Sequence, residues 1–206
     1  MSRWDVPDAL WSSNNLYDVP TLRLQQQADA LDAPVVTWGS VSRSLQMDGT
    51  WHFYTDDYRF TALLNDPSPV VETGCVTAVE PNFSIHQQTP VAVGLFRIYQ
   101  KRWIARYWQS KGIRIFVDLN VAPKFLDLNL LGVPEGWRAY ATRGYNAKVG
   151  HTIEEHEAAC QRAGTESVLF VVYGGGEDVQ QLCADRGFIW IPEHYDRVKL
   201  NGQGIR

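Results

Sequence analysis

Three acidic residues each follow directly after a run of apolar residues: Glu80, Asp118 and Glu193. Carboxylates in such positions supply general acid/base catalysis or bind a divalent metal ion through oxygen. We therefore take these three as the candidate catalytic residues, and we leave open whether a divalent metal serves as cofactor. The alternative is that the ends of apolar strands face solvent and are polar for that reason alone.

Other polar residues follow the same apolar runs. Asn82 and Asn120 come two residues after Glu80 and Asp118, and Arg143 and Tyr145 follow the run at 137–142. Amide, guanidinium and phenol groups position a substrate by hydrogen bonding. The expected substrate-binding residues are therefore Asn82, Asn120, Arg143 and Tyr145.

A helix is predicted over residues 90–111, because Pro90 suits a first turn and Gly112 suits a C-terminal stop. Its aromatic residues recur at helical spacing, which indicates packing on a sheet. The same helix is rich in cations, and no acidic residue lies between positions 80 and 118. Either these cations bind phosphates or their stems lie along a solvated helix face. The candidate nucleic-acid-binding residues are Arg97, Lys101, Arg102 and Arg106.

The order of elements along the chain predicts an α/β fold. Short runs rich in β-branched and aromatic residues alternate with polar turns and helical segments that end at glycine. This order is typical of a mainly parallel sheet with flanking helices, either open or closed into a partial or irregular (β/α) barrel. In both architectures the binding site lies where strands end and loops begin. The expected strands lie at 35–38, 47–54, 75–79, 113–117, 137–142, 168–173 and 188–191.

Three local patterns add detail. Asp48-Gly49 is a hairpin-type turn signal, and Thr152 with Glu155 forms a capping box at the start of a helix that ends at Gly164. Residues 173–178 resemble a phosphate-binding turn before a helix. The two acidic residues at 177 and 178 would repel a phosphate, however, and they stabilise the helix dipole without a ligand.

Length and composition bound the class of protein. The 206 residues, with 45% hydrophobic residues, predict an N-terminal arm at 1–34, one α/β domain at 35–199 and a tail at 200–206. The net charge of −4 excludes a globally basic surface, so nucleic acid as a partner requires a local patch. The three isolated cysteines and the lack of a long apolar run predict a cytoplasmic protein without a membrane partner. Oligomeric state is left open.

The segments 80–90, 96–120, 137–145 and 168–175 together resemble an uncharacterised domain family, DUF4417, carried by phages, plasmids and other mobile elements. The resemblance covers residues 35–195. Its most specific parts are Pro-Asn-Phe-Ser-Ile at 81–85 and Arg-Tyr-Trp-Gln-x-x-Gly at 106–112. It implies a mobile-element origin and a role around DNA or the host response, and it assigns no activity to any residue.

Two functional hypotheses follow. The first is a protein that acts on nucleic acid or a nucleotide-like substrate, by metal-assisted phosphodiester hydrolysis or by nucleobase exchange at a carboxylate. The second is a non-catalytic protein that blocks or bridges host or replication factors. Catalysis requires the carboxylates at the strand ends, whereas the binding role requires the helix cations.

Overall fold

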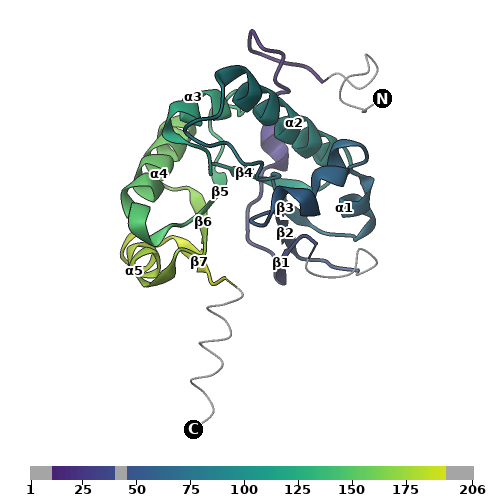
Figure 1. Cartoon of the computed structure of the whole chain (residues 1–206). Helices are drawn as coiled ribbons and strands as arrows, with labels where there is room; N and C mark the ends of the chain where they lie inside the picture. Colours follow the sequence, from purple (N-terminus) through teal and green to yellow (C-terminus); the bar gives the residue numbers. More distant parts are fainter. Residues whose placement is uncertain (1–10, 40–45, 194–206) are drawn as a thin grey trace.

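The computed structural model describes residues 11–39 and 46–193. Its centre is a seven-stranded sheet in which sequence order and spatial order coincide and every neighbouring pair is parallel. The sheet curls into a half-barrel (Figure 1). The predicted α/β class is therefore confirmed, in the form of a partial barrel. The strands are β1 (Val35–Thr37), β2 (Thr50–His52), β3 (Thr77–Val79), β4 (Arg114–Asp118), β5 (Ala139–Arg143), β6 (Leu169–Tyr173) and β7 (Ile189–Ile191).

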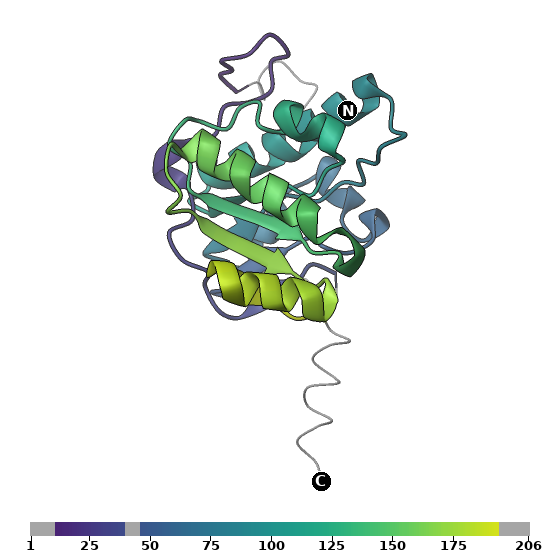
Figure 2. The same cartoon turned by 90° about the vertical axis from the view of Figure 1, so that its left-hand side faces the viewer.

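Helices cover the convex side of the half-barrel (Figure 1), and α4 and α5 run alongside β5 and β6 (Figure 2). The predicted helix at 90–111 is α2, and Gly164 and Gly187 end α4 and α5 in the left-handed conformation that glycine adopts without strain. The α-helices are α1 (Ser68–Glu72), α2 (Val91–Ser110), α3 (Leu126–Asn129), α4 (Val149–Ala163) and α5 (Gly176–Arg186). Short 3₁₀ turns are η3 (Leu24–Gln26), η4 (Asp57–Arg59), η5 (Thr61–Leu64), η6 (Pro123–Phe125) and η7 (Asn146–Lys148).

Both faces of the sheet are buried, which explains why its strands are continuous apolar runs. The convex face packs on the helices through residues such as Ile115, Tyr140 and Val172. Aromatic rings meet on the concave face, where His52 lies 4.4 Å from Tyr173 and Tyr54 stacks on Tyr173 at 5.6 Å between ring centroids. These contacts join the end of β2 to β6 across the half-barrel and hold its curvature.

Helix α2 is buried on most of its surface because a second layer covers it. The Gln109 side chain accepts a hydrogen bond from the Arg23 backbone N–H at 2.8 Å, and the ring centroids of Trp11 and Trp103 lie 6.3 Å apart. The segment from Trp11 onward, part of the predicted N-terminal arm, therefore packs against the outer side of α2. The aromatic residues at helical spacing on α2 therefore differ in burial. Trp103 stacks on Tyr107 beneath this segment, whereas Phe96 is 46% exposed.

Two local expectations were wrong. Asp48-Gly49 does not form a hairpin, because β1 and β2 are parallel and their connection must cross over. The Thr152–Glu155 capping box is also absent: α4 begins at Val149, and the Glu155 side chain turns into the core instead of back to the helix end. Tertiary burial overrides the local capping preference at this position.

Gly94 allows α2 to pack closely on Phe125, and we predict opposite effects for two Gly→Ala changes. A Cβ at position 94 would overlap the ring of Phe125, which is fully buried and cannot move aside. We expect Gly94→Ala to lower the free energy of unfolding by about 1–3 kcal/mol. A Cβ at Gly150 meets no atom, so Gly150→Ala is the matched control and should be neutral or stabilising by about 0.5–1 kcal/mol. Urea denaturation measures both, and equal effects would contradict the packing.

Candidate functional site

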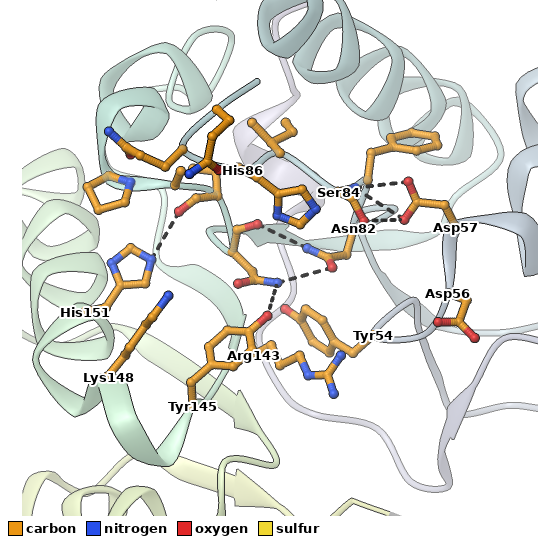
Figure 3. Close-up of a pocket in the computed structure, with 18 of the residues that line it drawn as sticks. Tyr54, Asp56, Asp57, Asn82, Ser84, His86, Arg143, Tyr145, Lys148 and His151 are labelled. Atoms are coloured by element: carbon orange, nitrogen blue, oxygen red, sulfur yellow. Dashed lines mark hydrogen bonds between the residues drawn. The ribbon is translucent and has the colours of Figure 1, made fainter. Parts of the chain in front are cut away.

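A pocket of about 1330 Å³ opens at the carboxyl ends of β2 to β5. All four residues that the sequence predicted as substrate-binding line it: Asn82, Asn120, Arg143 and Tyr145. Figure 3 labels Asn82, Arg143 and Tyr145. They come from the loops after β3 and β4 and from the end of β5 with the loop that follows it, so the curl of the parallel sheet is what brings them together. The other lining side chains used below are Tyr54, Asp56, Asp57, Ser84, His86, Lys148, His151 and Glu154.

Asp118 lies beneath the floor of this pocket and is 1% exposed. Its carboxylate accepts hydrogen bonds from Lys101 Nζ at 2.9 Å and from the Tyr54 hydroxyl at 3.2 Å. Burial, followed by the charge of Asp118, raises the pKa of Tyr54 well above its usual value, so this phenol stays protonated and donates. Asp118 is therefore a fully satisfied anchor of the pocket floor.

Glu80 forms a second buried ion pair behind the floor. Arg102 Nη1 donates to Glu80 Oε1 at 2.5 Å, and Arg102 Nη2 donates to the Asn129 backbone oxygen at 2.6 Å. Both side chains are 0% exposed. Burial raises the pKa of Glu80 and lowers the pKa of Arg102, while the attraction between the two groups opposes both shifts. The pair connects β3, α2 and α3, and neither member lines the pocket.

The four predicted nucleic-acid-binding cations do not share one exposed surface. Lys101 and Arg102 point into the ion pairs described above, and Arg106 is 5% exposed with its guanidinium 4.6 Å from the Trp11 ring centroid. Arg97 is half-buried and donates to Gln100 Oε1 at 3.2 Å. Arg106 is buried because the segment that begins at Trp11 covers its side of α2, whereas Lys101 and Arg102 are buried against the carboxylates of Asp118 and Glu80.

Glu193, the third predicted catalytic residue, does not line the pocket but contacts Arg143, which does. Its Oε1 accepts a hydrogen bond from Arg143 Nη2 at 3.1 Å, and the two side chains are 33% and 35% exposed. The Arg143 guanidinium also lies 5.6 Å from the ring centroid of Tyr145. Glu193 thus fixes Arg143, and its neighbour His194 lies outside the described residues.

A chain of amide hydrogen bonds forms the pocket floor (Figure 3). Asn82 Nδ2 donates to both oxygens of Asp118, at 3.3 and 3.2 Å. Asn120 Nδ2 donates to Asn82 Oδ1 at 3.2 Å and to the Tyr145 hydroxyl oxygen at 3.4 Å. The buried carboxylate is therefore linked through two amides to a phenol at the pocket surface.

The start of α4 forms another wall of the pocket, which the sequence reading missed. Lys148, Gly150 and His151 line it, Lys148 is exposed, and the first turn of α4 contains no acidic residue and no side-chain cap. The positive end of the helix dipole and Lys148 thus act in the same direction. The α5 start differs: Asn146 Oδ1 accepts from the Asp178 backbone N–H at 3.0 Å, so the glycine-rich turn already holds a protein partner.

Glu155 is a buried acid next to this wall, and it was also missed. It is 0% exposed, its Oε2 accepts from the Thr142 hydroxyl at 2.7 Å, and its Oε1 lies 3.3 Å from His151 Nε2. Burial raises its pKa well above the usual value. His151 Nε2 lies 3.1 Å from the Val121 carbonyl oxygen, which can only accept, so this nitrogen carries a hydrogen. No sequence pattern distinguishes Glu155 from an exposed helical glutamate.

One acidic residue of the pocket, Asp57, has a structural role. Asp57 accepts hydrogen bonds from the Ser84 backbone N–H at 3.1 Å and from the Ser84 hydroxyl at 2.9 Å, and so holds the loop after β3 in place.

Among the described residues, no group of three or more His, Cys, Asp or Glu side chains is arranged to hold a metal ion. Over the same residues, no helix has the length and apolar character that crossing a membrane requires.

Comparison with known proteins places the chain among phage relatives. It is 30% identical over 132 residues to the Gene 1 protein of Mycobacterium phage L5, which covers 61% of this chain and 56% of that protein. It is 28% identical over 163 residues to the Gene 1 protein of Mycobacterium phage D29, with 76% and 57% covered. The matches thus span just over half the length of each relative. No solved structure gives a significant match.

A family match completes the comparison and agrees with the resemblance noted in the sequence. Residues 11–155 match the family described as "Domain of unknown function (DUF4417)". This range includes the segment packed on α2, strands β1 to β5 and all of the pocket lining. The chain therefore belongs to the DUF4417 family.

Proposed function

We propose that this protein binds a nucleotide-like ligand in the pocket at the carboxyl end of the half-barrel. The observation that carries the proposal is the pairing, within one pocket of about 1330 Å³, of a hydrogen-bonding floor with a cationic wall. The floor consists of Asn82, Asn120 and Tyr145, and the wall of Lys148 and the start of α4. The acidic residues that line the same pocket are Asp56, Asp57 and Glu154. Ligand pockets typically have volumes of about 300–1,000 Å³, so a mononucleotide fits with room for water.

The two ends of the pocket suit the two ends of a nucleotide. Lys148 is exposed and makes no ion pair among the described residues, so its ammonium group is available to a phosphate. The start of α4 adds a partial positive charge of about half an elementary charge. The floor groups hydrogen-bond and carry no net charge, which suits the heterocyclic base. The ligand would thus extend from α4 toward Tyr145.

The two reactions considered from the sequence each require a carboxylate that reaches the ligand. Glu80 and Asp118 are buried and ion-paired below the floor, and Glu193 is paired with Arg143. Their positions favour a role in orienting the pocket. We therefore propose nucleotide recognition without an assigned reaction. We propose Lys148, in place of the cations of α2, as the residue that contacts the phosphate.

A binding titration tests the proposal. Isothermal titration calorimetry with uridine 5′-monophosphate (UMP) and guanosine 5′-monophosphate should give saturable binding at low salt that weakens as salt increases. Lys148→Gln should weaken binding about tenfold, since a hydrogen bond to a charged group contributes about 1.5–3 kcal/mol. Lys111→Gln, at the exposed end of α2 away from the pocket, is the matched control and should bind like the wild type.

Two results would contradict this function. One is the absence of saturable binding for both nucleotides at low salt. The other is equal weakening by Lys148→Gln and Lys111→Gln, because a general effect of surface charge would then replace a contact in the pocket. Thermal melting of both variants, compared with the wild type, establishes that each is folded before it is titrated.

A further inference from the structure

The buried carboxylate of Asp118 determines which atoms the pocket floor presents to a ligand. A carboxylate only accepts hydrogen bonds, so the Asn82 side chain must direct Nδ2 toward it, at 3.3 and 3.2 Å from the two oxygens. The Asn82 Nδ2 also donates to the Asn120 backbone oxygen at 3.2 Å. Asn82 Oδ1 is then the atom of that amide that meets the Asn120 side chain.

The same logic fixes the next two groups. Asn82 Oδ1 accepts, so Asn120 must direct Nδ2 toward it, and that Nδ2 donates its second hydrogen to the Tyr145 hydroxyl oxygen at 3.4 Å. Asn120 Oδ1 receives no hydrogen bond from any described residue. The Tyr145 hydroxyl accepts from Asn120 and keeps its own hydrogen to donate, and the Tyr145 side chain is 39% exposed. The floor therefore presents one acceptor, Asn120 Oδ1, beside one donor, the Tyr145 O–H.

We propose that Asn120 and Tyr145 together recognise the Watson–Crick edge of an unpaired base, by accepting from a ring or amino N–H and donating to the adjacent acceptor. This inference rests on the proposed nucleotide binding and names the part of the ligand that the floor recognises. In a duplex the same edge is hydrogen-bonded to the opposite strand. The ligand is accordingly a free nucleotide or an unpaired nucleotide of a nucleic acid.

The orientation of the floor is held firmly, which allows it to discriminate. Lys101 Nζ donates to the Asp118 carboxylate at 2.9 Å and to the Asp118 backbone oxygen at 2.8 Å, and the Tyr54 hydroxyl donates to the other carboxylate oxygen. Reversal of either amide would place an oxygen against an oxygen, in a buried position for Asn82 and in a half-buried one for Asn120. A ligand without the N–H leaves Asn120 Oδ1 facing an atom that cannot donate.

The test compares UMP with its N3-methyl derivative by isothermal titration calorimetry. Methylation removes only the ring N–H, and we expect it to weaken binding to the wild type about tenfold, as for a lost hydrogen bond with one partner left unsatisfied. Asn120→Leu keeps the size of the side chain but removes the acceptor. The ratio of the two affinities should therefore fall close to one in this variant, whereas steric exclusion of the methyl group would keep the ratio unchanged.

Further variants separate the failure of this inference from the failure of the proposed function. In Lys148→Gln both ligands should weaken together while the ratio of about tenfold remains. Tyr145→Phe, which keeps the ring beside Arg143, should weaken UMP several-fold, and it serves as the second test if Asn120→Leu does not fold. Equal binding of UMP and N3-methyl-UMP to the wild type, with Lys148→Gln still weakening both, would overturn the inference and leave nucleotide binding intact. Absence of binding to UMP, to its N3-methyl derivative and to guanosine 5′-monophosphate would overturn the proposed function itself.

Discussion

Arg102→Met should lower the free energy of unfolding by about 3–5 kcal/mol, as is found when one member of a buried ion pair is removed. The Arg102 side chain is 0% exposed and donates to Glu80 Oε1 at 2.5 Å and to the Asn129 backbone oxygen at 2.6 Å. Methionine fills much of the volume but leaves a buried carboxylate and a buried carbonyl without these donors. Urea denaturation followed by tryptophan fluorescence measures the change.

Arg97→Met is the matched control on the same helix. Arg97 is half-buried and makes no ion pair among the described residues, so its replacement should change stability by less than about 0.5–1 kcal/mol. The double variant Arg102→Met/Glu80→Gln should recover part of the loss, because no buried charge then lacks a partner. An effect of Arg102→Met as small as that of Arg97→Met would contradict the buried ion pair.

Glu155→Gln should stabilise the protein increasingly as pH rises. Burial raises the folded-state pKa of Glu155 well above its unfolded value, so the folded state holds a proton that the unfolded state releases. Between these two pKa values, wild-type stability falls by about 1.4 kcal/mol for each pH unit on account of this group. Glutamine resembles the neutral acid and does not titrate. The variant should therefore match the wild type near pH 4.5 and gain relative to it up to the folded pKa.

Glu154→Gln is the control for this pH dependence. The Glu154 side chain is adjacent in sequence and 62% exposed, so its neutralisation should produce no comparable difference between pH 4.5 and pH 8. Urea denaturation at intervals across this range gives the free energy of unfolding for the three proteins. A constant difference between the wild type and Glu155→Gln would show that Glu155 ionises in the folded state as readily as in the unfolded chain.

The sequence predicted most of the architecture because the relevant signals are local. Apolar runs bounded by glycine and proline located the strands, and helix ends were marked at Gly112, Gly164 and Gly187. The rule that parallel strands direct their carboxyl ends to one edge placed Asn82 and Asn120 correctly, since both line the pocket. The resemblance to DUF4417, noted from short motifs over 35–195, is confirmed by the family match, which covers residues 11–155.

The burial of the basic residues of α2 could not be predicted from local sequence patterns. Helical spacing predicts which residues share a face, but it does not say how many faces are covered. Here Trp11 covers Arg106, and Lys101 and Arg102 meet carboxylates that lie far away in sequence. A cation opposite a buried carboxylate and a cation facing solvent have the same sequence appearance, because their difference lies in long-range contacts.

By itself, the sequence determined the order of elements, the mainly parallel α/β class and the edge at which polar side chains gather, because hydrophobic period, turn residues and strand direction act over a few residues. It left open whether the sheet is flat or curls into a partial barrel, and the structure decided that point. Only the tertiary structure decided what those side chains do. Asp118 is buried and ion-paired, Glu155 is buried with a raised pKa, and Lys148 is exposed beside the pocket, since hydrogen-bond partners and burial are set by segments brought together from β3, β4, β5 and α4. The free energy of a polar group depends on those surroundings more than on its type.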